Sequence, residues 1–250
     1  MAEYVVVDKE QLEADITTVA DAIREKGGTS EQLPFPNGMA DAVRGIESGG
    51  SDYLRCVYSA SMVASAFTDE KIVLNLDNIN TLNSLFYAYT AEQANKCVKH
   101  ITVNCLRKVV SLQYAFSSAY SKDKHLEQIT LNVDTSECSA FLRPFGYLHV
   151  LKIIDGTPLN LNKAANTTNM FQECYVLEEV RFVEGTIPMS ISFSNSPNLS
   201  DATRQSIIDG LADLTGGTAQ TITFHKDIEA KLSEEQKAQI TSKNWTLAFK

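Results

Sequence analysis

Two short patterns occur four times in the same order, and this repetition limits the fold more than any other feature of the sequence. The first is a small or apolar residue followed by phenylalanine: Leu85-Phe86, Ala115-Phe116, Ala140-Phe141 and Met170-Phe171. The second is an alternating apolar pair, typical of a strand with one buried face: Ile101/Val103, Ile129/Leu131, Leu151/Ile153 and Val180/Phe182. One such unit cannot bury its own apolar side, so the repetition predicts a stack of similar units.

The segment 169–182 shows the unit most clearly. Its apolar residues Phe171, Cys174 and Leu177 are spaced by three, which predicts a short helical turn before the strand. An apolar residue also precedes the other strand pairs by three positions: Val98, Leu126 and Leu148. The phenylalanine-to-strand separation falls from 15 to 13, 10 and 9 residues, so the connecting loop shortens along the chain.

Periods in the twenties with one strand per unit predict a leucine-rich-repeat-like solenoid within an α+β fold class, each unit a short strand plus a helical turn. An earlier strand at 72–76 fits as the opening unit. The alternative is a non-repetitive α+β domain.

The string Met170-Phe171-x-x-Cys174-x-x-Leu177-x-x-Val180-x-Phe182 resembles the repeat of BspA-like leucine-rich proteins. The match is close in this unit and partial in the others, where Tyr89, Ala119 and Pro144 stand at the cysteine position. The resemblance implies a curved solenoid whose common role is adhesion or surface recognition rather than catalysis.

The first 46 residues predict a small helical module for attachment or oligomerisation. Two helical patterns supply its apolar seam: Leu12, Ile16, Val19 and Ile23, then Met39, Val43 and Ile46. The alternative is an antiparallel helix pair in which each seam covers the other. Residues 47–52, rich in glycine and serine, predict a flexible linker to the solenoid at 53–198.

The pattern changes after Phe182 and predicts an α/β capping unit at 199–250. One more strand, around 187–193, precedes this unit. A helix N-capped by Ser200 then runs to about Leu214 and is closed by Gly216-Gly217. A strand at 221–224, a helix with a capping box at Ser233 and a strand at 244–249 complete the unit. In the second helix, Ala238 and Ile240 are expected to face inward.

Both ends carry a second resemblance. The segment from Val7 to Ile46, with its string A-I-R-E-K-G-G-T-S, resembles the N-terminal module of tail-associated proteins in prophages of Gram-positive gut bacteria. The closing strings L-T-G-G-T-A-Q-T-I-T-F, L-S-E-E-Q-K-A and N-W-T-L-A are similar to the ending of repeat proteins in the same setting. The resemblance implies a virion protein, and the apolar seam of the first 46 residues favours homo-oligomerisation or docking on other virion proteins.

The acidic balance limits the partners of the chain. With a net charge of -9 the chain has no basic excess to neutralise phosphates or an anionic membrane, so neither nucleic acid nor a membrane is expected as a partner. No apolar run has membrane-spanning length, and the first residues lack the features of a signal peptide. We therefore expect synthesis in a host cytoplasm and a final location in the virion.

Catalytic and metal-binding motifs are absent from the sequence, which predicts a protein that is not an enzyme and needs no cofactor or metal. The five cysteines form no C-x-x-C pair, and we interpret them as structural. His100, His125 and His149 are expected to share one position in successive units, as surface residues rather than metal ligands.

Tyrosines on the longest loops are the candidate binding residues. Tyr87, Tyr114 and Tyr120 lie around the phenylalanines, and tyrosine offers a large contact area at a low entropic cost. The alternative is that they fill the core. These residues favour a particle protein whose solenoid binds a host-surface protein or glycan. A cell-surface adhesin is the second hypothesis, and a glycan-active enzyme is the third.

Overall fold

The computed structural model of the protein describes residues 69–76, 79–87, 97–117 and 125–250. The chain divides into two compact units, Met1–Tyr53 and Leu54–Lys250, and every described residue belongs to the second. The predicted N-terminal module with its apolar seam, the linker and Tyr120 lie outside the described residues.

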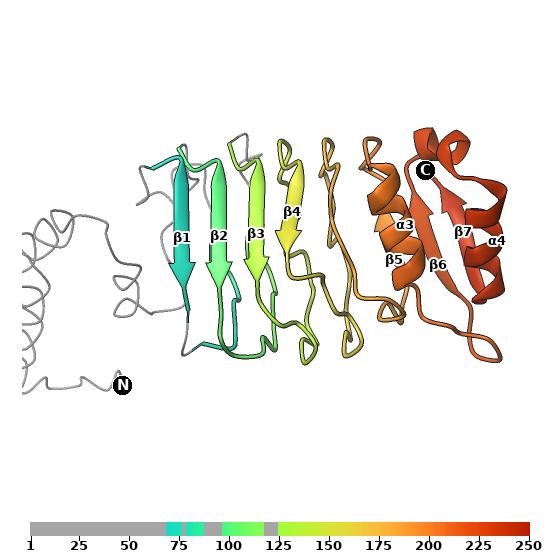
Figure 1. The fold of residues 1–250 in the computed structure, drawn as a ribbon, viewed down its shortest axis with the longest axis horizontal. Coiled ribbons are helices and arrows are strands. Elements are labelled where there is room, and N and C mark those ends of the chain that lie inside the picture. Colours follow the sequence, from blue (N-terminus) through green and yellow to red (C-terminus); the bar gives the residue numbers. More distant parts are fainter. Residues whose placement is uncertain (1–68, 77–78, 88–96, 118–124) are drawn as a thin grey trace, which may run out of the picture. The chain divides into compact units, whose positions relative to one another are not determined.

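Four short parallel strands form the first sheet (Figure 1). These are β1 (Lys71–Asn75), β2 (His100–Asn104), β3 (Gln128–Asn132) and β4 (Ile153–Gly156). Their second residues, Ile72, Ile101, Ile129 and Ile154, lie opposite one another and are buried. The alternation of buried and outward residues along each strand follows from the period of two. Of the predicted α+β fold with one short strand per unit, the structure shows a mixed α/β architecture with parallel sheets of short strands.

The third unit is shifted by three residues from the predicted alignment. Ile154, and not Leu151 or Ile153, lies opposite Ile129 in the sheet. Likewise Phe145, and not Phe141, has its ring stacked between those of its neighbours. The sequence carries two phenylalanines four residues apart, and only Phe145 stands nine residues before a buried strand position, the separation between Phe171 and Val180.

In the segment 171–177, turns rather than a helix lead from the phenylalanine toward the next strand position. Backbone bonds spanning three residues join Cys174 to Phe171 and Leu177 to Cys174, at 3.3 and 3.4 Å. These turns direct every third side chain of the segment toward the core. This explains why its apolar residues are spaced by three in the sequence.

A second ladder of backbone pairs runs along the opposite face. Isolated bridges join Thr81, Ser111, Ala140 and Asn166 in succession. Thr167 then donates its hydroxyl to the carbonyl of Ser190 at 2.8 Å, beside the second sheet. That sheet is parallel and contains β5 (Ile191–Phe193), β6 (Gln220–Phe224) and β7 (Trp245–Phe249).

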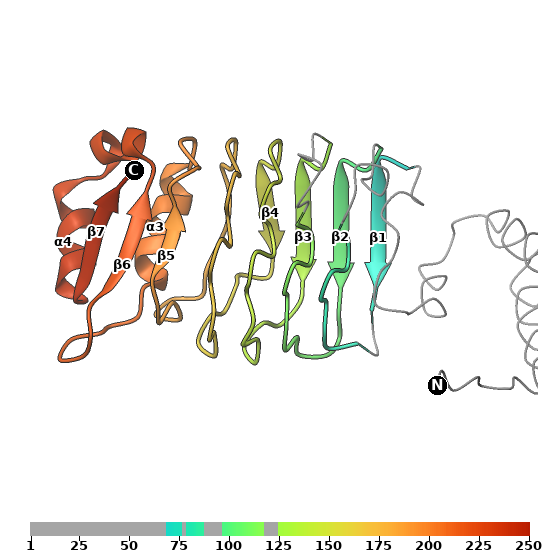
Figure 2. The same ribbon diagram turned by 180° about the vertical axis from the view of Figure 1, so that it is seen from behind.

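Near the C-terminus, a helix follows the strands of the first sheet along the same ladder of backbone hydrogen bonds. The amide of Ser200 donates to the carbonyl of Glu178 at 3.0 Å, and Glu178 in turn donates to Lys152. Ser200 N-caps α3 (Asp201–Gly210), which therefore follows the β1–β4 ladder. In Figure 1 α3 lies in front of β5, and Figure 2 shows β5, β6 and β7 from the other side.

Five stacked phenylalanines form the centre of the core, and we call them the phenylalanine column: Phe116, Phe145, Phe171, Phe193 and Phe224. Successive ring centroids are 6.0, 5.7, 4.7 and 6.1 Å apart, and every ring is buried. Cys174 lies fully buried nearby, and burial raises the pKa of its thiol to about 12. Its structural role agrees with the prediction, whereas Cys97 is exposed and contributes nothing to the core.

Asparagine side chains form a ladder at the ends of the first three strands. Asn104 donates its amide to the side-chain oxygen of Asn75, and Asn132 donates in the same way to Asn104, both at 2.7 Å. Each amide thus pairs with its equivalent on the preceding strand, in one direction along the sheet.

The C-terminal helices follow their sequence signals at their starts. Ser233 forms the predicted capping box with Gln236 at the start of α4 (Glu234–Ser242), which follows the 3-10 helix η3 (Lys226–Lys231). Helix α3, however, ends at Gly210, because Leu211 already adopts an extended conformation; Gly216 serves a later turn. Ala238 is exposed, and only Ile240 of the expected pair is buried.

Within the described part of the chain, no helix has the length and apolar character that crossing a membrane requires.

Candidate functional site

The structure brings two of the three candidate tyrosines into contact. The ring centroids of Tyr87 and Tyr114 lie 5.6 Å apart and the rings are tilted by 52°. Tyr87 directly follows Phe86, and Tyr114 stands two positions before Phe116, so both project from the turns beside the core phenylalanines. Both side chains are partly exposed and therefore do not serve only to fill the core.

Arg143 and Tyr147 extend this pair into a longer row. The guanidinium carbon of Arg143 lies 6.0 Å from the ring centroid of Tyr114 and 5.1 Å from that of Tyr147. Both distances are within the range of a cation–π interaction. We call the set Tyr87, Tyr114, Arg143 and Tyr147 the aromatic–arginine row.

The backbone places Tyr114 and Arg143 in the same way. Both have positive φ, at 56° and 49°, and both stand two positions before a core phenylalanine. Ser84 and Asn169 occupy the corresponding position elsewhere, with φ of 53° and 57°. Asparagine tolerates this left-handed conformation better than tyrosine or arginine does, so the row carries two large side chains where a small one is favoured.

A glycine makes room for the stem of Arg143. A Cβ atom added at Gly146 would lie 2.4 Å from Cγ of Arg143 and 3.1 Å from its Cδ. The arginine stem therefore lies directly against the backbone of Gly146. Any larger residue there would displace the arginine from the tyrosine rings.

No partner holds the guanidinium of Arg143 in the part of the chain that the structure describes: it forms neither an ion pair nor a hydrogen bond there. Its Nε atom is buried without a hydrogen-bond partner. The row thus combines apolar ring area with a cation whose terminal N–H groups form no hydrogen bond to a described residue.

His149, Glu173 and Tyr175 form a cluster close to the row. Nε2 of His149 lies 2.9 Å from Oε2 of Glu173, and its ring centroid lies 5.0 Å from that of Tyr175. Burial and then the charge of Glu173 raise the pKa of Tyr175, so its hydroxyl stays protonated and can donate a hydrogen bond. Tyr175 is 42% exposed.

The predicted alignment of the histidines is wrong. Lys99, Glu127 and Lys152 share one position in the first ladder. Counted from that position, His100 follows by one residue, His125 precedes by two and His149 precedes by three. The irregular loops cause the mismatch, and among the described residues no group of three or more potential ligands could hold a metal ion.

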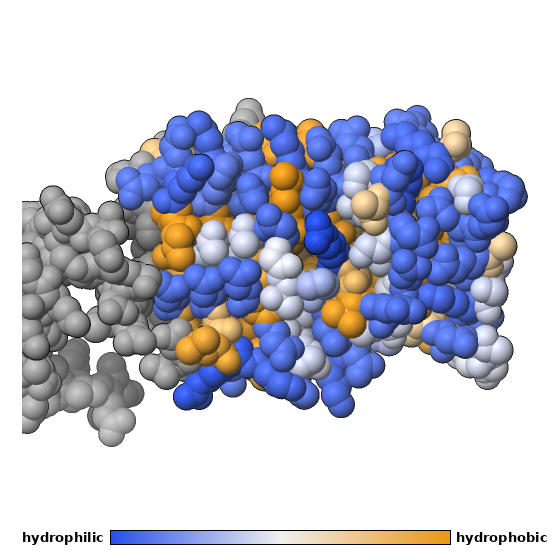
Figure 3. Space-filling model, viewed as in Figure 1, coloured by the Kyte–Doolittle hydropathy of each residue, from blue (hydrophilic) through white to orange (hydrophobic). Residues whose placement is uncertain are grey.

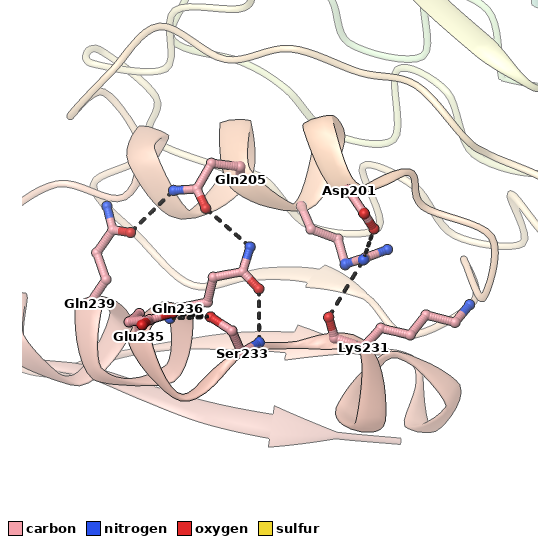
Figure 4. Close-up of a pocket in the computed structure, with 8 residues that line it drawn as sticks. Asp201, Gln205, Lys231, Ser233, Glu235, Gln236 and Gln239 are labelled. Carbon is pink, nitrogen blue, oxygen red and sulfur yellow. Dashed lines mark hydrogen bonds and ion pairs between the residues drawn. The ribbon is translucent and has the colours of Figure 1, made fainter.

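A polar groove between α3 and α4 is the second candidate (Figure 4). It has a volume of about 350 Å³. Its lining residues are Asp201, Arg204, Gln205, Lys231, Ser233, Glu235, Gln236 and Gln239. Arg204, 7% exposed, is its most enclosed charged side chain.

The polar groups of the groove mainly bond to one another. Arg204 donates to the carbonyls of Leu199 and Lys231 and pairs with Asp201. The amide of Gln236 donates to Gln205 at 3.0 Å, and that of Gln205 donates to Gln239 at 3.1 Å. These bonds join α3 to α4, so the groove has a structural use for most of its polar atoms.

The face carrying β1–β4 and the helices is mainly hydrophilic, with separate apolar spots (Figure 3). The large apolar side chains exposed among the described residues are Val73, Leu106, Val110, Tyr175 and Val183.

Sequence reasoning missed Arg143, Tyr147 and the groove. Arg143 stands two positions before Phe145, as Tyr114 stands before Phe116, but the choice of Phe141 as the landmark hid this equivalence. The groove depends on how α3 meets α4 and leaves no local pattern.

No protein-family model, curated protein or solved structure matches the chain.

Proposed function

We propose that this protein is a non-enzymatic structural component of a phage particle that displays a leucine-rich-repeat-like solenoid to bind a host surface. The observation that carries the proposal is the aromatic–arginine row, which offers an organised and partly exposed contact surface on a scaffold of parallel strands.

The solenoid is supported by the two ladders and the phenylalanine column. Successive strands of the first sheet pair at offsets of 29, 28 and 25 residues, as Ile72, Ile101, Ile129 and Ile154 show. The corrected alignment adds a second close match to the BspA-like repeat: Pro144-Phe145-x-x-Leu148-x-x-Leu151-x-x-Ile154. In a solenoid each unit buries its apolar side against its neighbours, and the stacked rings of the phenylalanine column support that arrangement.

A binding role is supported by the chemistry of the row. Tyrosine rings give a large contact area and lose little entropy on binding, while a cation over ring faces adds directional donors. Several copies on one particle would turn a weak single contact into firm attachment. The assignment to a phage particle rests on the resemblance of both chain ends to prophage proteins, and a bacterial adhesin remains the alternative.

Two measurements test the proposal. Mass spectrometry of purified phage particles should detect the chain in several copies, and its absence would contradict the particle assignment. The full-length protein should also bind host-cell envelopes. The double variant Tyr87→Ala/Tyr114→Ala should weaken envelope binding at least tenfold. Leu106→Ala, which removes an 83% exposed side chain outside the row, is the matched control and should leave binding unchanged. Equal binding by both variants would contradict the role of the row.

A further inference from the structure

We infer that the aromatic–arginine row recognises an anionic glycan, with the sugar rings against the tyrosines and a carboxylate or phosphate of the glycan at Arg143. The inference rests on the proposed function and names the class of ligand for the same surface.

The first argument is the state of the Arg143 guanidinium. Its central carbon lies over the rings of Tyr114 and Tyr147, at 6.0 and 5.1 Å from the ring centroids. No carboxylate among the described residues pairs with it. Its two terminal amino groups form no hydrogen bond to a described residue, and such a pair of N–H donors matches an oxyanion in a bidentate way.

The second argument is the backbone beneath the row. Tyr114 and Arg143 hold φ of 56° and 49° where another unit has Asn169 at 57°. Large residues are strained in this region, and such strain is more common at functional sites than elsewhere. Gly146 is a second local adaptation to Arg143, because only a residue without Cβ leaves room for the arginine stem.

The third argument is the spacing and composition of the row. Contacts of 5.6, 6.0 and 5.1 Å join Tyr87, Tyr114, Arg143 and Tyr147 in succession. This arrangement suits an extended chain of rings that lie one against each tyrosine, and the tyrosine hydroxyls can bond to sugar hydroxyls. A purely neutral sugar would leave the arginine donors unused.

The negative net charge of the chain does not help to attract an anionic glycan. A chain with a net charge of -9 repels a polyanion at long range, so its affinity must arise from the row itself. An acidic peptide could satisfy Arg143 but would not supply rings for three tyrosines. The observations therefore favour a glycan.

The test measures binding of the full-length protein to four polymers by calorimetry. These are polygalacturonate, the same polymer with its carboxyl groups reduced, a phosphomannan (a mannose polymer that carries phosphate groups) and polyglutamate. We expect polygalacturonate or the phosphomannan to bind at least tenfold more tightly than the reduced polymer and polyglutamate. The tighter of the two identifies the source of the oxyanion.

Variants of the arginine connect that preference to the row. Arg143→Asn should lower the affinity for the preferred anionic polymer at least tenfold, and Arg143→Lys should lower it about threefold. Gly146→Ala should also weaken binding while leaving the charge in place. Arg181→Asn removes the same charge from an exposed position in another part of the fold and should change nothing. Thermal unfolding of each variant checks that it is folded.

The outcomes separate this inference from the proposed function. Equal affinity for the acidic and the reduced polymer, or full affinity in Arg143→Asn, overturns the anionic glycan but leaves envelope binding intact. Polyglutamate bound as tightly as the glycans also overturns it, in favour of a protein partner. Envelope binding without binding to any of the four polymers overturns it as well. Loss of envelope binding itself contradicts the proposed function.

Discussion

Arg143 and Arg204 are both arginines held close to the protein surface, and the fold uses their guanidinium groups in opposite ways. In the groove, Arg204 donates to the carbonyls of Leu199 and Lys231 and pairs with Asp201. In the row, Arg143 lies over two tyrosine rings and bonds to no described residue through its guanidinium.

The difference shows why a hollow surface is not in itself a site. The groove is a hollow of about 350 Å³, but most of its amides and charges bond to one another and join two helices, and among its buried side-chain nitrogens and oxygens only Nε of Arg204 lacks a partner. In the row, the guanidinium of Arg143 forms no hydrogen bond or ion pair with a described residue. Unsatisfied polar groups on an organised scaffold are the stronger sign of a ligand, because a ligand can supply what the fold does not.

The largest effect should come from the column beneath both regions. Phe171→Ala removes a buried ring that stacks on Phe145 and Phe193, and it should lower the free energy of unfolding by about 3–5 kcal/mol. Urea unfolding followed by circular dichroism measures the loss. A single transition in the variant would show that the row and the groove share one cooperative unit, whereas two transitions would show that they unfold separately.

A matched pair of arginine variants should separate the two regions. Arg204→Met leaves a buried carbonyl without its donor and should cost about 2–3 kcal/mol of unfolding free energy. Arg143→Met loses only the ring contacts and should cost about 0.5–1 kcal/mol. Urea unfolding of both variants checks the difference, and equal losses would contradict the opposite roles assigned to the two side chains.

The smallest effect should come from exchanging residues at the shared turn position. Arg143→Asn loses a cation–π contact of about 0.5–1 kcal/mol but relieves a strain of similar size, so its stability should stay within about 0.5 kcal/mol of the parent. Asn169→Arg adds the strain without a known partner and should cost about 1 kcal/mol. Thermal and urea unfolding measure both. A large loss in Arg143→Asn would mean that the arginine is structural.

Much of the fold follows from local sequence signals. The period-two pairs around Ile101 and Ile129 correctly predict buried faces of strands, and Ser200 and Ser233 correctly mark helix starts, because these signals act within one turn or strand. The register of the third unit could not be fixed in this way. Phe141 and Phe145 are both buried, and only contacts with the neighbouring units decide which one joins the column.

The candidate site was predictable to the same extent. Tyr87 and Tyr114 could be identified from their positions beside Phe86 and Phe116. Arg143 could not be identified in this way, since its position corresponds to that of Tyr114 only when Phe145, and not Phe141, is matched to Phe116. The groove was unpredictable because its residues come from two helices whose packing no single stretch encodes.

The asparagine ladder helps to fix the register of the strands β1, β2 and β3. A slip of one residue between parallel strands is already excluded, because it would turn every buried side chain outward. A slip of two residues would keep the buried faces of the strands correct, so the alternation of side chains alone does not exclude it. It would, however, place Asn104 opposite Val73 and break the amide bonds to Asn75 and Asn132, at about 1 kcal/mol for each bond. Three asparagines thereby keep the turns at constant height, and the spacing of the side chains along the row depends on that alignment.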